Sequence, residues 1–262
     1  MKIFCIGKNY LLHNEEIDGR RYKTEQPVVF MKPESAVLKN GKPFFLPDHL
    51  GRVDHEVELV VRICRLGKNV SERFAHRYYD AVTVGIDFTA RDLQRRLKDN
   101  GHPWEIAKAF DGSAAIGEWI DLKPTPNLKP TSNLKPTPNP SRGEGGLVSP
   151  SSIITMEQGN QAPLPSGGVG GGSQAGGGFE VGGGQLGAGF HLDINGQTVQ
   201  AGRTEDMLYK VDELISYISR YFTLKTGDML FTGTPAGVGP VSIGDHLEGY
   251  LEDRKLLDFW VR

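Results

Sequence analysis

Short apolar runs rich in valine, isoleucine and phenylalanine recur through the first part of the chain. They occupy residues 2–6, 28–31, 56–64 and 82–86, and glycine, proline or aspartate bounds them. β-branched and aromatic residues in runs of this length are typical of buried strands. We therefore predict a strand in each run.

Helical patterns follow in two places. Thr89 has Asp92 three residues on, so we predict a helix that Thr89 caps and that the Asn100-Gly101 pair ends. Apolar residues then recur every three or four positions over residues 208–222, which predicts an amphipathic helix capped by Thr204.

Further strands are predicted near the end of the chain. Residues 190–194 and 198–200 flank Asn195-Gly196, a pair typical of a tight hairpin turn. Residues 229–232 predict a strand that leads into a loop rich in glycine and proline at 233–240, and residues 249–261 alternate enough to predict one more strand.

A low-complexity segment separates these two parts. A hexapeptide, Leu-Lys-Pro-Thr followed by Pro or Ser and then Asn, repeats three times between residues 122 and 139. Glycine dominates residues 159–189. Proline at this density excludes regular elements, and so little apolar surface cannot offset the entropy of ordering. We predict a disordered insert at 123–189 and a single catalytic domain built from residues 1–122 and 190–262. A nucleotide-binding loop at 168–172 is disfavoured, because it lacks the flanking strand and helix.

The composition favours small-molecule chemistry. The chain has 262 residues, 38% of them hydrophobic, and a formal net charge of -2, so no strong field attracts nucleic acid or an anionic membrane. Its two cysteines lie in apolar runs, which argues against a disulfide framework. No apolar stretch is long enough for a signal peptide or a membrane span, so we expect a cytoplasmic protein.

Candidate chemistry begins with two carboxylates. Glu56 and Glu58 are two residues apart in a predicted strand, so both should leave the same face. The apolar continuation indicates a buried strand, in which like charges need a cation; the alternative is the polar outer face of an edge strand. Asp87 follows another apolar strand and adds a third carboxylate. Oxygen ligands alone favour Mg²⁺, with Mn²⁺ or Ca²⁺ as alternatives.

Two further features are ambiguous by themselves. His13 and Glu16 are three residues apart and share one face of a helical turn, where a carboxylate can orient an imidazole as a general base, although such pairs are common on surfaces. Lys108 is a lone basic residue among apolar neighbours, so it is either a surface lysine or a partner of carboxylates or substrate.

Several motifs in sequence order resemble the fumarylacetoacetate hydrolase superfamily, in particular its short acylpyruvase and oxaloacetate decarboxylase branch. They are Gly7-Lys8-Asn9-Tyr10 with His13 and Glu16, His55-Glu56-Val57-Glu58, Asp87 with 89–94, Pro103-Trp104 with 107–111, and 232–240. One departure is Lys8, where an arginine is common in the family.

The resemblance implies roles for individual residues. As metal ligands it implies Glu56, Glu58 and Asp87, and as catalytic residues His13 and Glu16 on a mobile lid, with Lys108 near the metal. As substrate-binding residues it implies Arg91, Gln94 and Thr234. It also implies an α+β, strand-rich fold, a mixed β-sandwich roll with peripheral helices, and a homodimer.

The implied activity is metal-dependent chemistry on a small 2-oxo acid or 1,3-dicarbonyl. Hydrolysis of a carbon–carbon bond in an acylpyruvate and decarboxylation of oxaloacetate both fit these residues, and isomerisation, decarboxylation or hydration of a 2-hydroxy-dienoate is an alternative. A catalytically inactive metal-binding or interaction protein and a structural glycine-rich protein are rivals of other classes, and the complete set of candidate residues argues against both.

Overall fold

A mixed sheet forms the centre of the structure, a computed structural model that describes residues 1–39, 41–122 and 187–262. Almost all of the predicted insert lies outside the described residues. In spatial order the sheet contains β2 (Val28–Lys32), β1 (Ile3–Gly7), β12 (Met229–Phe231), β5 (Val57–Ile63), β6 (Tyr79–Asp87), β8 (Ala114–Ile116) and β3 (Val37–Lys39), and β9 (Ile120–Asp121) pairs with β6. The pairs β1–β12 and β3–β8 are parallel.

Two smaller sheets accompany it. One has the order β11 (Gln197–Arg203), β10 (Gly189–Ile194), β14 (His246–Leu251) and β15 (Arg254–Trp260). The other has the order β13 (Gly239–Pro240), β4 (Val53–His55) and β7 (Thr89–Ala90). The central sheet thus contains strands from both sides of the insert, because β12 lies between β1 and β5.

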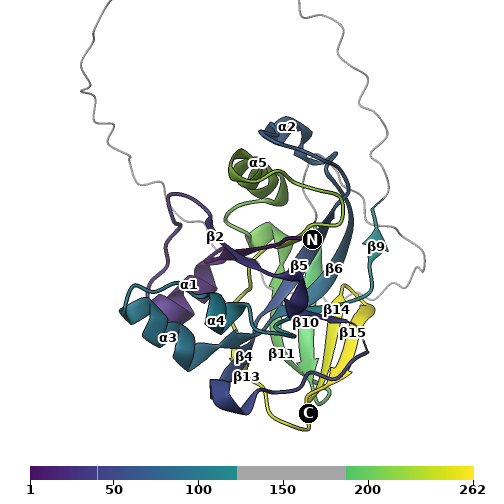
Figure 1. Cartoon of the computed structure of the whole chain (residues 1–262). Helices are drawn as coiled ribbons and strands as arrows, with labels where there is room; N and C mark the ends of the chain where they lie inside the picture. The colour runs from purple at the N-terminus through teal and green to yellow at the C-terminus, as the bar shows by residue number, and fades with distance from the viewer. Residues whose placement is uncertain (40, 123–186) are drawn as a thin grey trace, which may run out of the picture. The chain divides into compact units, whose positions relative to one another are not determined.

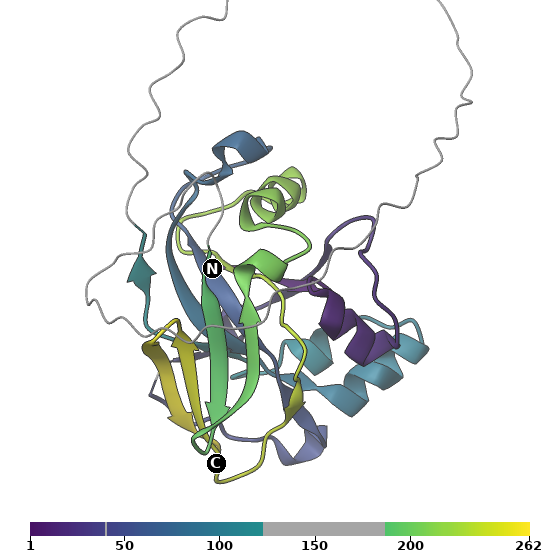
Figure 2. The same cartoon turned by 180° about the vertical axis from the view of Figure 1, so that it is seen from behind.

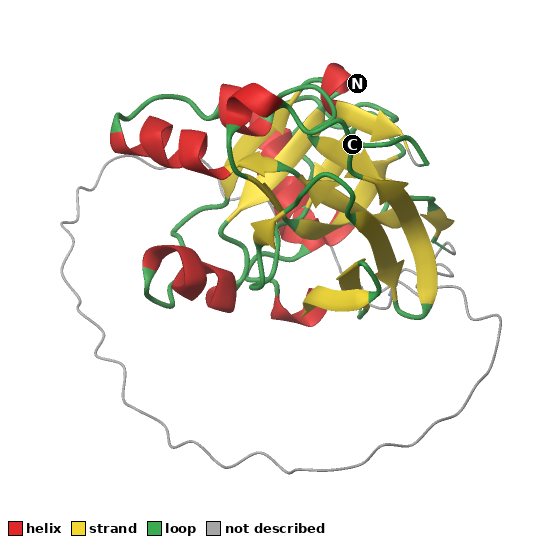
Figure 3. Cartoon of the chain, turned by 90° about the horizontal axis from the view of Figure 1, so that it is seen from below, coloured by secondary structure: helices red, strands yellow, loops and turns green. Residues whose placement is uncertain are grey.

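Short helices lie around the strands (Figure 3). The α-helices are α1 (Leu11–Asp18), α2 (Glu72–Ala75), α3 (Arg91–Asp99), α4 (Glu105–Lys108) and α5 (Val211–Tyr221), and the 3₁₀ turns are η1 (Glu34–Ala36), η2 (Asp48–Leu50) and η3 (Thr204–Asp206). Figures 1 and 2 show α1, α3 and α4 together on one side of the central sheet, with α2 and α5 at another end. The predicted strand-rich α+β fold is confirmed. Within the described ranges, no helix is long and apolar enough to span a membrane.

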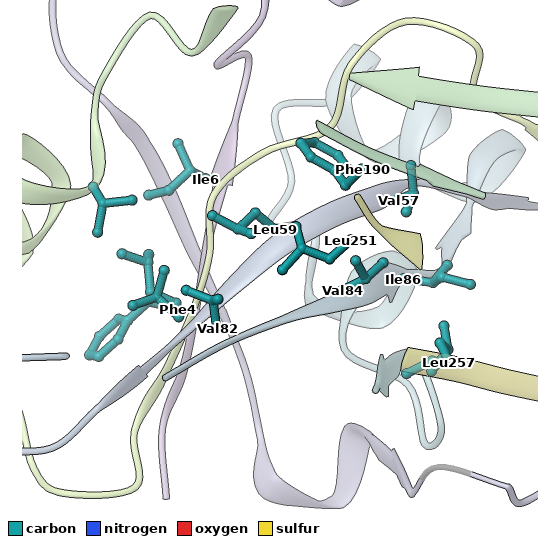
Figure 4. Packing of buried hydrophobic residues seen from close by; sticks show 14 of the residues in the cluster. Phe4, Ile6, Val57, Leu59, Val82, Val84, Ile86, Phe190, Leu251 and Leu257 are labelled. Atoms are coloured by element: carbon teal, nitrogen blue, oxygen red, sulfur yellow. The ribbon is translucent and has the colours of Figure 1, made fainter. Parts of the chain in front are cut away.

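Side chains alternate between the two faces of the central sheet along β5 and β6, so apolar residues gather on one face and Glu58 and Asp87 lie on the other. Val57 and Leu59 of β5 and Val84 of β6 are fully buried on the face that meets the four-stranded sheet, in which Leu257 of β15 packs (Figure 4). Each such side chain contributes about 1.5–3 kcal/mol by leaving water. The even-numbered positions of β5, which begin with Glu58, face the opposite side.

Glycine allows close packing on this second face. A Cβ atom at Gly85, which pairs with Glu58 in the register of β5 and β6, would lie 2.8 Å from the carbonyl oxygen of Ala115 and 2.7 Å from a methyl group of Val60. Asp87 lies two residues beyond Gly85 on the same strand, so its side chain leaves the same face as Glu58.

The predicted hairpin is present. Asn195 and Gly196 have φ values of 53° and 76°, as a two-residue turn with both central residues left-handed requires. The strand structure predicted at 249–261 is present, but a turn at 252–253 divides it between two antiparallel strands, β14 and β15. The strand predicted at 56–64 is present as β5, which is one residue shorter at each end, so that Glu56 lies between β4 and β5.

Both predicted helix caps were wrong. Helix α3 begins at Arg91 without a side-chain cap, and the Thr89 hydroxyl instead accepts a hydrogen bond of 2.6 Å from Lys108 Nζ. Helix α5 begins at Val211, whereas Thr204 starts a separate 3₁₀ turn and accepts a hydrogen bond of 2.9 Å from the Ala188 amide. In both places a tertiary partner outweighs the local capping pattern.

Candidate active site

Three buried carboxylates meet where β5 begins and β6 ends. Glu56, Glu58 and Asp87 are 5%, 2% and 1% exposed, and each offers an oxygen atom within 4.8 Å of the others. The amide of Asp87 donates to the carbonyl oxygen of Glu56 over 2.9 Å, which fixes the two strand ends together. The predicted ligand set is therefore assembled by the antiparallel pairing of β5 and β6.

Lys108 of α4 places its ammonium group against this cluster. Its Nζ atom lies 2.7 Å from Glu56 Oε2 and 2.9 Å from Asp87 Oδ2, and the residue is 3% exposed. A buried ammonium group needs such partners, because an unpaired charge in the interior is very costly. Of the two alternatives that the sequence left open, the structure shows the carboxylate partner.

Arg91 holds Glu56 from the other side. Its Nη2 atom donates to Glu56 Oε1 over 2.5 Å, and its Nε atom donates to Asp54 Oδ2 over 2.8 Å. Its Nη1 atom donates to Gln94 Oε1 over 2.9 Å. Arg91 therefore orients a carboxylate of the cluster and the Gln94 amide at once.

Lys32 is a member of the cluster that the sequence analysis missed. It is 1% exposed, and its Nζ atom lies 2.9 Å from Asp87 Oδ1 and 2.9 Å from Ser113 Oγ. The same atom donates to the backbone carbonyl of Lys108. Each oxygen of Asp87 thus faces a different lysine.

These charges give neighbouring carboxyl groups opposite pKa shifts. Burial alone would raise the pKa of Glu56, but the charges of Lys108 and Arg91 outweigh it and hold this pKa well below its usual range. Burial and the charges of Asp87 and Glu56 raise the pKa of Glu58 well above its usual range. Glu58 accepts a hydrogen bond of 2.6 Å from the Gly233 amide, which does not offset the repulsion. A cation among the three carboxylates would stabilise the charged form of Glu58.

His13 and Glu16 form a pair on α1. His13 Nδ1 lies 3.3 Å from Glu16 Oε2, and the Gly237 amide donates to the Glu16 carboxylate over 3.1 Å. Although burial opposes the shift, the hydrogen bonds from His13 and Gly237 lower the pKa of Glu16. An ionised Glu16 can fix the orientation of the imidazole.

A network of buried hydrogen bonds holds the loop that contacts Glu16. Thr234 donates its hydroxyl proton to the Val57 carbonyl over 2.8 Å and accepts a hydrogen bond of 2.7 Å from Gln200 Nε2. The Oε1 atom of Gln200 accepts from the Val57 amide over 2.9 Å and lies 3.1 Å from His55 Nδ1. Sequence analysis missed Gln200, and it named His55 only as part of a family motif, without a role.

All of the predicted site residues line one cavity of about 310 Å³. Its wall includes the three carboxylates with Lys108, the pair on α1, and the predicted substrate contacts, namely Glu56, Glu58, Asp87, Lys108, His13, Glu16, Arg91, Gln94 and Thr234. Lys8, Arg95, Lys98, Phe30 and Trp104 also line it. A cavity with a buried acidic floor and the His13–Glu16 pair on its wall suits acid–base chemistry on a small anion that binds with a cation.

The chain is similar in sequence and structure to several known proteins. The oxaloacetate tautomerase YcgM of Escherichia coli K12 is 32% identical over 246 residues, which cover 94% of this chain and 86% of YcgM. The structure of fumarylpyruvate hydrolase from Pseudomonas aeruginosa in complex with Mn²⁺ and pyruvate is 27% identical, with a TM-score of 0.72 and coverage of 100% of this chain and 89% of the hydrolase.

A third relative extends the range of named activities. The structure of 2-hydroxyhepta-2,4-diene-1,7-dioate isomerase from Mycobacterium marinum is 26% identical, with a TM-score of 0.65 and coverage of 99% of this chain and 73% of the isomerase. The sequence pattern of the fumarylacetoacetate (FAA) hydrolase C-terminal family matches residues 2–261. The chain therefore belongs to the FAA hydrolase family, whose members include tautomerases, hydrolases and isomerases.

Proposed function

We propose that the protein is an enzyme that acts on small 2-oxo acids or 1,3-dicarbonyls, with a divalent cation held by Glu56, Glu58 and Asp87. The observation that supports this most strongly is the single cavity that these carboxylates share with Lys108 and the His13–Glu16 pair. Hydrolysis of a carbon–carbon bond in an acylpyruvate is the reaction that best uses all of these groups.

The donor set fits a hard cation. It consists of carboxylate oxygens that are buried and close together, without histidine or cysteine ligands in the cluster. Mg²⁺ and Mn²⁺ prefer such ligands, and Ca²⁺ is a further alternative. A bound cation supplies electrophilic stabilisation for negative charge that develops on the oxygen atoms of a 2-oxo acid.

Lys108 contributes a fixed positive charge to the same place. Its ammonium group is held by Glu56, Asp87 and the Thr89 hydroxyl, so it needs little reorganisation as negative charge develops on a substrate. Burial opposes its protonated form, but the charges of Asp87 and Glu56 outweigh this and raise its pKa, which keeps it cationic. Lys108 would therefore bind the substrate electrostatically and would not act as a base.

His13 is positioned to move protons. Because its Nδ1 atom faces Glu16, its Nε2 atom is the one left to accept a proton from water. The water oxygen would attack the distal carbonyl of an acylpyruvate while Nε2 takes the proton. The carbon–carbon bond would then break, its electron pair would remain on the pyruvate fragment as an enolate, and a proton would finally be returned to that fragment's carbon.

Keto–enol tautomerisation of oxaloacetate is a second candidate, favoured by the named activity of the E. coli relative. His13 would then take a proton from the carbon beside the keto group and return it to the oxygen. Decarboxylation of oxaloacetate needs neither the water nor this base, so the dependence on His13 separates it from the other two reactions. The isomerase relative suggests proton transfer within a 2-hydroxy-dienoate as a further alternative.

The test is an assay with acetylpyruvate, fumarylpyruvate and oxaloacetate in the presence of Mg²⁺, for the wild type and H13A. The matched control is H49A, because the side chain of His49 is 76% exposed. We expect acylpyruvate cleavage to fall by about 10²–10⁴-fold in H13A, as for the loss of a general base, and to stay unchanged in H49A. Equal cleavage by H13A and the wild type would exclude the proposed role of this pair.

A further inference from the structure

One face of helix α3 runs along the cavity from its acidic floor. Arg91, Gln94, Arg95 and Lys98 all line the cavity, and their spacing of three and four residues places them on the same helical face. Arg91 contacts Glu56, whereas Lys98 lies seven positions further along the helix. At 1.5 Å per residue, the backbone positions of Arg91 and Lys98 are about 10 Å apart along the axis.

A second lysine from the opposite wall meets Lys98 at this far end. Lys8 Nζ lies 2.9 Å from Asp18 Oδ2, and Lys98 Nζ lies 3.0 Å from Asp18 Oδ1. Burial opposes the shift, but hydrogen bonds from Tyr22 and both lysines hold the pKa of Asp18 below its usual range. The chain's own carboxylate thus shows that these two ammonium groups can share one carboxylate.

The position of Lys8 is fixed by its backbone. Lys8 has a φ of 61°, a left-handed conformation that residues other than glycine adopt uncommonly and that often occurs at functional sites. The Asn14 side chain donates to the Lys8 carbonyl over 3.2 Å, and the buried Asn9 side chain ties the next residue to the carbonyl oxygens of Tyr209 and Thr232. This turn directs the Lys8 side chain to the cavity instead of leaving it free at the surface.

The two lysines retain hydrogen-bonding capacity. An ammonium group has three N–H donors. Among the described residues, Lys98 Nζ donates to Asp18, and Lys8 Nζ is within hydrogen-bond distance of Tyr22 and Asp18. The side chain of Lys98 is 47% exposed and that of Lys8 is 26% exposed. A second carboxylate can therefore bind to both ammonium groups without displacing Asp18.

We propose that Lys8 and Lys98 form a subsite for the distal carboxylate of a long 2-oxo dicarboxylic acid. This rests on the proposed function, which places the 2-oxo acid group at the floor beside Glu56 and Lys108. An extended chain advances about 1.2 Å per bond, since a residue of three backbone bonds spans about 3.3–3.6 Å. A diacid of seven carbons then spans about 7 Å, and hydrogen bonds to the lysine ammonium group extend this reach to the far end of α3. The four carbons of oxaloacetate span only about 4 Å and cannot reach both ends.

The competing explanation for the same contacts is a purely structural role, a latch, in which these ion pairs only hold two helices together. Asp18 ends α1, so its ion pairs with Lys8 and Lys98 also tie α1 to α3. A latch would affect every ligand of the cavity alike. A distal carboxylate subsite affects only ligands that have a second carboxylate, so the preference for a diacid separates the two roles.

The experiment is calorimetric titration, in the presence of Mg²⁺, with two unreactive ligands of equal length, 2-oxoheptanedioate and 2-oxoheptanoate. We expect the wild type to bind the diacid about tenfold more tightly, as for a charge-assisted contact with a partly buried pair, and K98M to lose most of that preference. The matched control is R96M, which removes a cation from an exposed position of the same helix and should keep the preference.

The outcomes separate the subsite from the proposed function. Equal affinity of the wild type for both ligands, or a preference that K98M retains, would overturn the subsite while leaving 2-oxo acid binding intact. Equal weakening of both ligands in K98M would show a latch alone. Failure of both ligands to bind the wild type would refute the proposed function itself. As a second variant, D18N removes the negative charge that partly neutralises both lysines and should increase the preference for the diacid.

Discussion

Gln200 offers the sharpest test of how the fold holds the site. It is 2% exposed, and its amide connects β5 to the loop that follows β12. Its Oε1 atom accepts from the Val57 amide over 2.9 Å, and its Nε2 atom donates to Thr234 Oγ1 over 2.7 Å and to the Pro235 carbonyl over 2.8 Å. The same loop contributes the Gly237 amide that binds Glu16.

The substitution Q200L keeps the approximate volume and removes all of these hydrogen bonds. The Val57 amide and the Pro235 carbonyl would then be buried without their partner. Leaving such a group unsatisfied costs about 1–3 kcal/mol, so we expect Q200L to lower the free energy of unfolding by about 2–6 kcal/mol. Because the loop also fixes Glu16, turnover that depends on His13 should fall more than the affinity for a divalent cation.

Urea denaturation of Q200L and Q197L measures this effect. Gln197 is on the same strand but is exposed, so the same substitution there should change the free energy of unfolding by less than about 0.5 kcal/mol. A loss in Q200L no larger than that in Q197L would refute the argument that this amide holds the loop in place.

Three more predictions concern stability. Glu58 has a raised pKa in the metal-free folded state, so unfolding above a pH of about 4.5 releases a proton from this carboxyl group. In EDTA, the free energy of unfolding of the wild type should therefore fall relative to that of E58Q as the pH rises, by up to about 1.4 kcal/mol per pH unit. A difference between the two proteins that stays constant between pH 5 and pH 8 in urea titrations would contradict this. K108M removes the cation that Glu56 and Asp87 share, although Arg91 and Lys32 each still contact one of them, and should cost about 3–5 kcal/mol. K255M removes a lysine that also pairs with two carboxylates but is 43% exposed, and should cost at most about 1 kcal/mol; similar losses would show that burial of Lys108 is unimportant. G85A places a Cβ 2.7 Å from a methyl group of Val60 and should lower the free energy of unfolding by about 1–3 kcal/mol or more. The control is G7A, because a Cβ at Gly7 would lie no nearer than 3.6 Å to another atom. Equal melting temperatures of the two variants would contradict the expected effect of G85A.

Much of the site could be predicted because it follows from strand geometry. Glu58 and Asp87 lie on one face because side chains alternate along β5 and β6, and the register pairs Glu58 with Gly85. The Asn195-Gly196 turn is equally local, since it depends on two residues that tolerate positive φ. The family motifs supplied what alternation could not, namely that the α1 pair and Lys108 belong to the same cavity.

The features that sequence analysis missed depend on distant partners. Gln200 lies in a hairpin of polar appearance, and His55, its partner, is 145 residues away. Lys32 ends an apolar strand and is 76 residues from Lys108, whose carbonyl it contacts. Nothing in the local sequence distinguishes Gln200 and Lys32 from exposed side chains, and the motif that contains His55 does not identify its partner, because only the packed fold brings these partners together.

The same reason accounts for the wrong caps. Thr89 and Thr204 have the local patterns of helix caps, but their hydroxyl groups bind Lys108 and the Ala188 amide instead. Capping contributes about 1 kcal/mol, which is less than the cost of leaving a buried ammonium or amide without an acceptor. Local patterns therefore failed where a buried tertiary partner competed for the same oxygen.

The central claim is that Glu56, Glu58 and Asp87 hold a divalent cation on which activity depends. Calorimetric titration of Mn²⁺ into the wild type and E58Q tests it most directly, because E58Q keeps the shape of the side chain and removes one negatively charged ligand. We predict one binding site in the wild type and a loss of affinity of at least about tenfold in E58Q. Equal binding by both proteins, or no binding by the wild type, would contradict the claim.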